Sequence, residues 1–72
     1  MNWVFILIAF TPQGAVVERV GLDSPGQCVA YAKGYTGRPE MREAHIQMAQ
    51  CVGLRSGAVI PVPTPKPAPA LL

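Results

Sequence analysis

Apolar residues form an unbroken run near the start of the chain, from Trp3 to Phe10. The run is too short for a membrane-spanning helix, which needs roughly 20 apolar residues. It also lacks the basic flank and the small-residue cleavage site of a secretory signal. Trp, Val, Phe and Ile favour extended backbone, and a short apolar run closed by a turn is typical of a buried strand. The run therefore predicts an inner β-strand.

A turn and a more polar strand follow this run. Residues 11–14 read TPQG, with proline and glycine at positions that suit a tight turn. Residues 15–20 are β-prone but include Glu18 and Arg19, which can face water from a strand near the sheet edge. The pattern predicts a β-hairpin.

Residues 24–27 have the sequence features of a helix start. Ser24 is placed to cap the helix, Pro25 suits its first position, and Gln27 completes a capping box. The helix is expected to run about three turns and to end between Gly34 and Gly37. Its core-facing residues are expected to be Cys28, Val29, Ala32 and one of the tyrosines Tyr31 and Tyr35.

Residues 39–53 allow two interpretations. Local propensity and a spacing of three and four favour an amphipathic helix closed by Gly53, with an apolar side made of Met41, Ala44, Met48 and Cys51. Alternation favours a strand in which Ile46, Met48 and Val52 share one face. We favour the strand, because a two-stranded hairpin with one helix is only marginally stable, whereas a third strand gives a sheet that is stable on its own.

The predicted fold class is α+β, in the order β-β-α-β. A third strand running antiparallel to the first gives a three-stranded antiparallel sheet in the order 2-1-3, with one helix packed on one face. We assign residues 1–56 to this domain. Residues 57–72 contain five alternating prolines and predict an extended polyproline II arm that ends in Leu71 and Leu72.

Cys28 and Cys51 are the two cysteines of the chain. A disulfide between them would close a loop whose entropy contributes about 3 kcal/mol to a small domain, and it implies an oxidising environment. The alternative is a pair of reduced, buried cysteines that act as small hydrophobes. His45 adds one further ligand type, which is too few for a metal site. We expect no metal, no cofactor and no catalytic residue.

Charge gives no sign of a nucleic-acid or nucleotide partner. The net charge is +2, and the basic residues are scattered among the acidic ones instead of being clustered. The sequence has no phosphate-binding loop, nucleotide fingerprint or glycosidase-like carboxylate pair, and a cysteine nucleophile with His45 as its base would lack an oxyanion loop and a third orienting residue. We therefore expect a non-enzymatic protein with no small-molecule substrate and no membrane partner.

The pattern resembles the small uncharacterised proteins of tailed phages and their bacterial hosts. The resemblance covers residues 1–55 and is carried by Met1, Trp3, Asp23, Ser24, Cys28, Cys51 and Val52. It implies a two-cysteine β-β-α-β fold and supplies no catalytic or binding residues.

A single helix can cover only one face of the sheet. We expect the other face to be an exposed apolar surface, which is typical of an interface. The residues assigned to this interface are Trp3, Phe5 and Leu7, with the arm tip Leu71 and Leu72. The favoured hypothesis is an accessory or structural protein that assembles on itself or on a larger structure, such as a capsid decoration or minor structural protein in a phage virion. A phage-encoded inhibitor or regulator of a host protein, located in the cytoplasm or periplasm, is the alternative. A secreted or periplasmic module stapled by the disulfide is the third.

Overall fold

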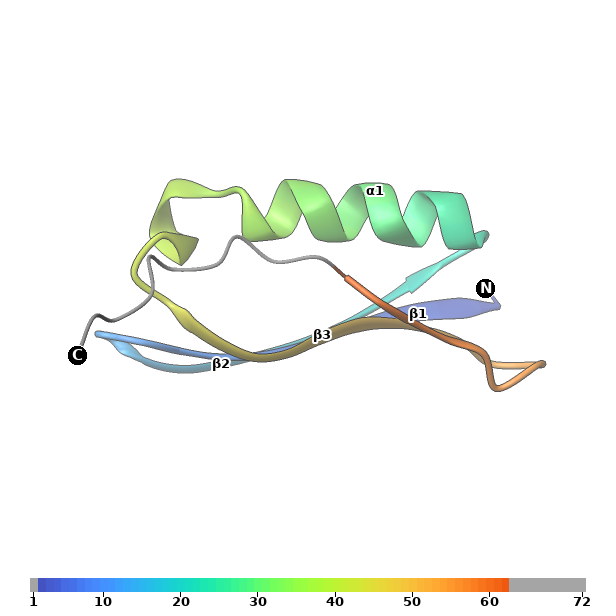
Figure 1. Ribbon diagram of the computed structural model, residues 1–72, viewed down its shortest axis with the longest axis horizontal. Helices are drawn as coiled ribbons and strands as arrows, with labels where there is room; N and C mark the ends of the chain where they lie inside the picture. Colours follow the sequence, from blue (N-terminus) through green and yellow to red (C-terminus); the bar gives the residue numbers. More distant parts are fainter. Residues whose placement is uncertain (1, 63–72) are drawn as a thin grey trace.

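The protein forms two layers, with one helix lying across one face of a four-stranded antiparallel sheet (Figure 1). The computed structural model describes residues 2–62. The sheet has the order β2-β1-β3-β4, so β1 is an inner strand, as its apolar run predicts. The elements are β1 (Trp3–Thr11), β2 (Gly14–Leu22), α1 (Pro25–Thr36), a 3-10 turn (Pro39–Met41), β3 (His45–Gly53) and β4 (Val59–Pro61). The α+β class and the single helix on an antiparallel sheet are confirmed.

The β1–β2 hairpin forms where the turn sequence predicts it. The two strands pair without interruption from Trp3 opposite Leu22 to Thr11 opposite Gly14. Gly14 has a φ of 132°, a backbone conformation that side-chain-bearing residues rarely adopt. The Thr11 hydroxyl donates to the Gly14 carbonyl at 2.9 Å, which closes the turn.

Helix α1 begins with the predicted cap. The Ser24 side chain accepts a hydrogen bond from the Gln27 backbone N–H at 3.1 Å, and Pro25 occupies the first turn. The Gln27 side-chain oxygen accepts from the Asp23 backbone N–H at 3.2 Å, so two donors at the helix start are satisfied reciprocally. At the other end the Gly37 N–H donates to the Lys33 carbonyl at 3.1 Å. The helix therefore has the boundaries that its capping residues predict.

Strand β3 settles the ambiguity over residues 39–53 in favour of the strand. The helix-prone residues at the start of that range form only the short 3-10 turn before β3 begins at His45. Strand β3 pairs with β1 along nearly its whole length, which satisfies its backbone groups and buries Cys51. Long-range pairing and burial thus override the local helix propensity.

Strand β4 corrects the expectation of three strands. Residues 57–72 were assigned to an extended arm, but Val59–Pro61 pairs antiparallel with β3 as a fourth strand. Proline is compatible with β4 because β4 is an edge strand. No further strand pairs with its outer side, so the N–H that proline lacks is not needed there. Val62 then donates its backbone N–H to the Ala49 carbonyl at 3.0 Å and buries its side chain. The domain therefore continues to Val62; the predictions for the arm, including Leu71 and Leu72, lie outside the described residues.

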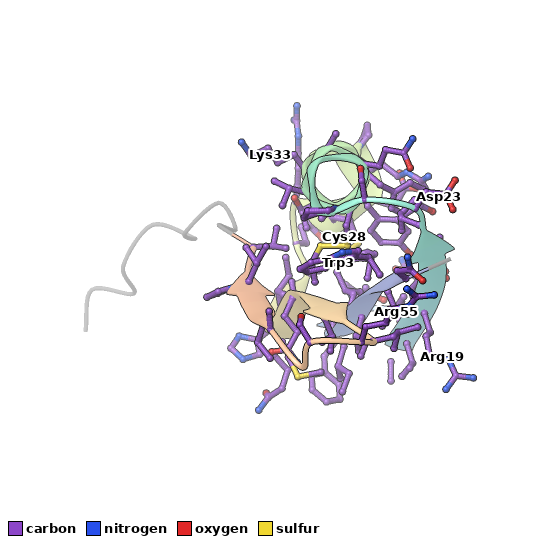
Figure 2. The ribbon with its side chains drawn as sticks, turned by 90° about the vertical axis from the view of Figure 1, so that its right-hand side faces the viewer. Trp3, Arg19, Asp23, Cys28, Lys33 and Arg55 are labelled. Carbon is purple, nitrogen blue, oxygen red and sulfur yellow. A yellow bond between two sulfur atoms is a disulfide. The ribbon has the colours of Figure 1, made fainter. Side chains whose placement is uncertain are left out.

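The core lies between α1 and the sheet. Its fully buried side chains of largest volume are Phe5, Leu7, Cys28 and Cys51. A disulfide joins Cys28 on α1 to Cys51 on β3, with 6.1 Å between their Cα atoms. Figure 2 shows this bond between the helix and the sheet, with Trp3 on the same side of the sheet. Of the two expectations for Cys28 and Cys51, the structure therefore has the disulfide.

Candidate interaction surface

The residues expected to form the open face of the sheet lie instead under the helix. Phe5 and Leu7 are 0% exposed, and Trp3 packs against the same core. The reason is the register of β3: Phe5 lies directly opposite Cys51, whose side chain must face α1 to reach Cys28. Phe5 and Leu7 therefore hold the helix on the sheet, and the prediction that Trp3, Phe5 and Leu7 lie on the uncovered face is wrong.

The opposite side of the sheet is the surface that we call the open face. Strand alternation and the pairing registers assign its residues, because directly paired residues share a face. It consists of Val4, Ile6, Ile8 and Phe10 on β1; Ala15, Val17, Arg19 and Gly21 on β2; His45, Met48, Gln50 and Val52 on β3; and Val59 and Pro61 on β4. Figure 1 shows α1 on the other side, and no element of residues 2–62 covers this face.

Large apolar side chains of the open face are in contact with solvent. Val17 is 69% exposed, Val59 53% and Phe10 49%. The registers place Val17 beside Ile8 and Met48, and Val59 beside Val52 and Val4, so partly buried apolar side chains of β1 and β3 lie between the exposed residues of the two outer strands. Scattered apolar residues are ordinary on a protein surface, whereas a continuous apolar patch indicates an interface.

A β-bulge changes which residues of β3 lie on the open face. The register between β1 and β3 shifts between Ile8 and Ala9, which pair with Met48 and Ile46. As a result Ile46 joins Ala9 on the side of the core, while Met48 stays on the open face. The expectation that Ile46, Met48 and Val52 share one face is therefore wrong for Ile46, because the bulge interrupts the alternation of β3.

Charge is nearly absent from the open face. Of the residues that form it, Arg19 alone carries a permanent charge, and none carries a carboxylate. Figure 2 shows Arg19 projecting outward from the sheet at the β2 edge, away from its centre. Gln50 lies opposite Ile6 and adds one polar group near the middle. The open face is therefore mostly apolar, with the Gln50 amide near its middle and one cation, Arg19, at the β2 edge.

On the covered side, polar contacts of Tyr35 attach the C-terminal end of α1 to β2. The Tyr35 hydroxyl donates to the Glu18 carboxylate at 3.2 Å, and the Arg38 guanidinium lies 4.5 Å from the centre of the Tyr35 ring. Burial, and then the negative charge of Glu18, raise the pKa of Tyr35 above its usual value. Tyr31 and Tyr35 also pack on the ring of Phe5, with centroid distances of 5.7 and 5.9 Å. The packing of α1 against the sheet explains why these side chains lie together.

The two edges of the sheet differ. Strand β2 presents nine residues along a free edge, whereas β4 presents three and ends in a proline. A long free edge offers unpaired backbone groups to another strand. The mid-strand charges on Glu18 and Arg19 limit how another copy of the same strand can pair there.

The remaining surface offers little for catalysis. A shallow hollow of about 240 Å³ lies between the β1–β2 turn and the 3-10 turn, lined by Pro12, Gln13, Pro39, Glu40, Arg42 and Glu43. Neither cysteine is available as a nucleophile, because both are in the disulfide. His45 lies opposite Phe10 on the open face, so it is not brought near Cys51 on the covered face. Within residues 2–62, no three His, Cys, Asp or Glu side chains gather as a metal site would require.

Comparisons with protein-family models, with curated proteins and with solved structures gave no match to this chain. Among the described residues, no helix has both the length and the apolar character needed to cross a bilayer.

Proposed function

We propose that this protein is a small, non-enzymatic assembly protein that binds another protein surface through the open face. The observation that carries the proposal is the one-sided architecture: α1 covers the face that holds Phe5 and Leu7, while the face that holds Ile8 and Val17 is apolar and bare among the described residues. Covering such a face with an apolar partner surface releases water and stabilises the complex.

The covered side supports the proposal because it holds the buried core and the disulfide. The Cys28–Cys51 disulfide and the buried side chains of β1 and α1 all lie between helix and sheet. The open face contributes little to this core. It is therefore free to be used for binding after the chain has folded.

For the biological setting, we propose a structural or accessory component of a larger particle, such as a decoration or minor structural protein of a phage virion. Two arguments support this setting. The first is the resemblance of residues 1–55 to small proteins of tailed phages. The second is the disulfide, which persists in particles and compartments outside the reducing cytosol. The disulfide gives equal support to a periplasmic or secreted location.

A second candidate function is an inhibitor or regulator of a host protein, and the free edge of β2 favours it. An extended segment of a partner can add to such an edge as a further strand. The backbone groups of all nine β2 residues face either β1 or this edge, so a peptide of matching length has a full ladder to pair with.

Site-specific photo-crosslinking in cells that carry the gene tests the assembly function. A photoreactive residue replaces Val17 on the open face in one variant and Ala30 on the outer side of α1 in the other; both positions are exposed. We expect covalent adducts with protein from the Val17 position and none from the Ala30 position. Absence of adducts from Val17, or equal adducts from both positions, would contradict the proposal.

A further inference from the structure

We propose that the partner of the open face is a second copy of this chain, packed face to face as a two-layer β-sandwich dimer. This inference rests on the proposed function, because it names the occupant of the same surface. Stacked sheets pack about 10 Å apart through interdigitating side chains. The rows Val4, Ile6, Ile8, Phe10 on β1 and Met48, Val52 on β3 supply those side chains.

The area of the face fits a dimer. Strands β1, β2 and β3 have nine residues each. At about 4.8 Å between strands and about 3.3 Å per residue, they cover a flat area of roughly 450 Å². Two copies therefore bury roughly 900 Å² before side-chain relief is counted, which approaches the roughly 1,000 Å² expected of a specific interface. An interface of this size predicts a reversible dimer, not a permanent one.

The charges of the face also fit a second copy. Because the open face has no carboxylate, a partner does not have to supply matching cations at its centre. A two-fold axis parallel to the strands, between β1 and β3, places β2 of one copy over β4 of the other. Arg19 then lies at the rim beside Val59 and Pro61 of the second copy, and the two Arg19 side chains stay apart. The long arginine stem can cover apolar surface while its guanidinium remains in water.

Pairing of two copies through their β2 edges is disfavoured by the same charges. A two-fold antiparallel pair keeps both helices on one side, so it must place residues of the same face opposite each other. Full overlap of the nine-residue strand places Glu18 opposite Glu18 of the other copy. A shift toward the C-terminus of β2 places Arg19 opposite Arg19, whereas a shift toward its N-terminus places Val17 opposite Val17 and pairs only residues 14–20. Like charges directly opposite each other destabilise a sheet, so the charges disfavour two of these three registers, including the longest, and the third pairs fewer residues.

Sedimentation equilibrium of the full chain tests the dimer, from micromolar to millimolar protein. We expect a monomer–dimer equilibrium with a Kd in the micromolar range. Val17→Lys places a new charge on an exposed residue of the open face and is expected to weaken the dimer at least tenfold, that is by about 1.4 kcal/mol. Ala30→Lys makes the same charge change on the outer side of α1 and is expected to leave the Kd unchanged. Val59→Lys repeats the test from β4 should Val17→Lys disturb the fold.

The outcomes separate this inference from the proposed function. A wild-type chain that stays monomeric at millimolar concentration overturns the dimer, as does a dimer that Val17→Lys and Val59→Lys leave unaffected. If the chain is monomeric and the Val17 crosslink joins it to a different protein, the dimer fails and the assembly function stands. If the chain is monomeric and no crosslink forms from Val17, both fail.

Discussion

The indole ring of Trp3 lies against the backbone of Gly53, its partner across β1 and β3. A Cβ atom added at Gly53 would lie 3.2 Å and 3.3 Å from carbons of the Trp3 ring, and 2.8 Å from the Ser56 hydroxyl. The glycine thus makes room for an aromatic ring at the end of the covered face. An aromatic ring over a strand glycine compensates for its missing side chain.

The contact predicts that Gly53→Ala destabilises the fold. The Ser56 side chain can rotate away, but the Trp3 ring is held against the core, so overpacking is expected to lower the free energy of unfolding by about 1–3 kcal/mol. Gly34→Ala is the matched control, because nothing lies within 4 Å of its added Cβ inside α1. That change is expected to raise stability by about 0.5–1 kcal/mol. Urea denaturation of both variants checks the prediction, and equal effects would contradict it.

Loss of the disulfide is expected to destabilise the domain strongly. Cys28 and Cys51 enclose most of α1 and most of β3, and in the chain-entropy model a loop of this length contributes about 3 kcal/mol. The double variant Cys28→Ala, Cys51→Ala is therefore expected to unfold at much lower urea concentration than the oxidised protein. Wild-type protein unfolded in the presence of reductant is the control. Unfolding midpoints that are the same with and without the disulfide would show that the bridge adds nothing.

The raised pKa of Tyr35 predicts that the folded state loses stability at alkaline pH. Burial and Glu18 raise its pKa in the folded state above the unfolded value of 10.0. Below pH 10 the phenol is neutral in both states and its contribution is fully present; above pH 10 the unfolded chain ionises first, so stability falls until the folded pKa is passed. Tyr35→Phe is expected to flatten the decline measured by chemical denaturation between pH 8 and pH 11. An unchanged slope in the variant would exclude Tyr35 as its cause.

Local sequence signals predicted most of the elements. The TPQG turn, the Ser24 cap and the apolar run of β1 each depend on interactions within a few residues, so they could be recognised without knowing the fold. The central place of β1 followed from the same run, because an inner strand suits uninterrupted apolar sequence. These were the features for which local chemistry and the final topology agree.

The direction in which β1 faces could not be predicted from its own sequence. Its two rows of side chains are almost equally apolar, so either row could meet the helix. The deciding fact is the pairing of Phe5 with Cys51, which depends on the register between distant strands. Combining the disulfide with that register would have assigned Phe5 and Leu7 to the core.

Strand β4 was missed because its composition resembles the proline-rich residues that follow it. Proline in a sequence argues against an inner strand but not against an edge strand. The useful signal was the pair Val59 and Ile60 between Gly57, which has a φ of 74°, and Pro61. A glycine turn followed by β-branched residues is typical of a short returning strand.

The most direct test of the open face compares oxidation of two methionines in the unmodified protein. Met48 lies on the open face, whereas Met41 is 6% exposed in the core. Methionine oxidation by dilute peroxide, followed by peptide mass spectrometry, depends on the exposure of each sulfur. We predict that Met48 oxidises faster than Met41 in dilute protein and becomes protected when the protein assembles. A rate for Met48 that is the same in dilute and assembled protein would contradict it.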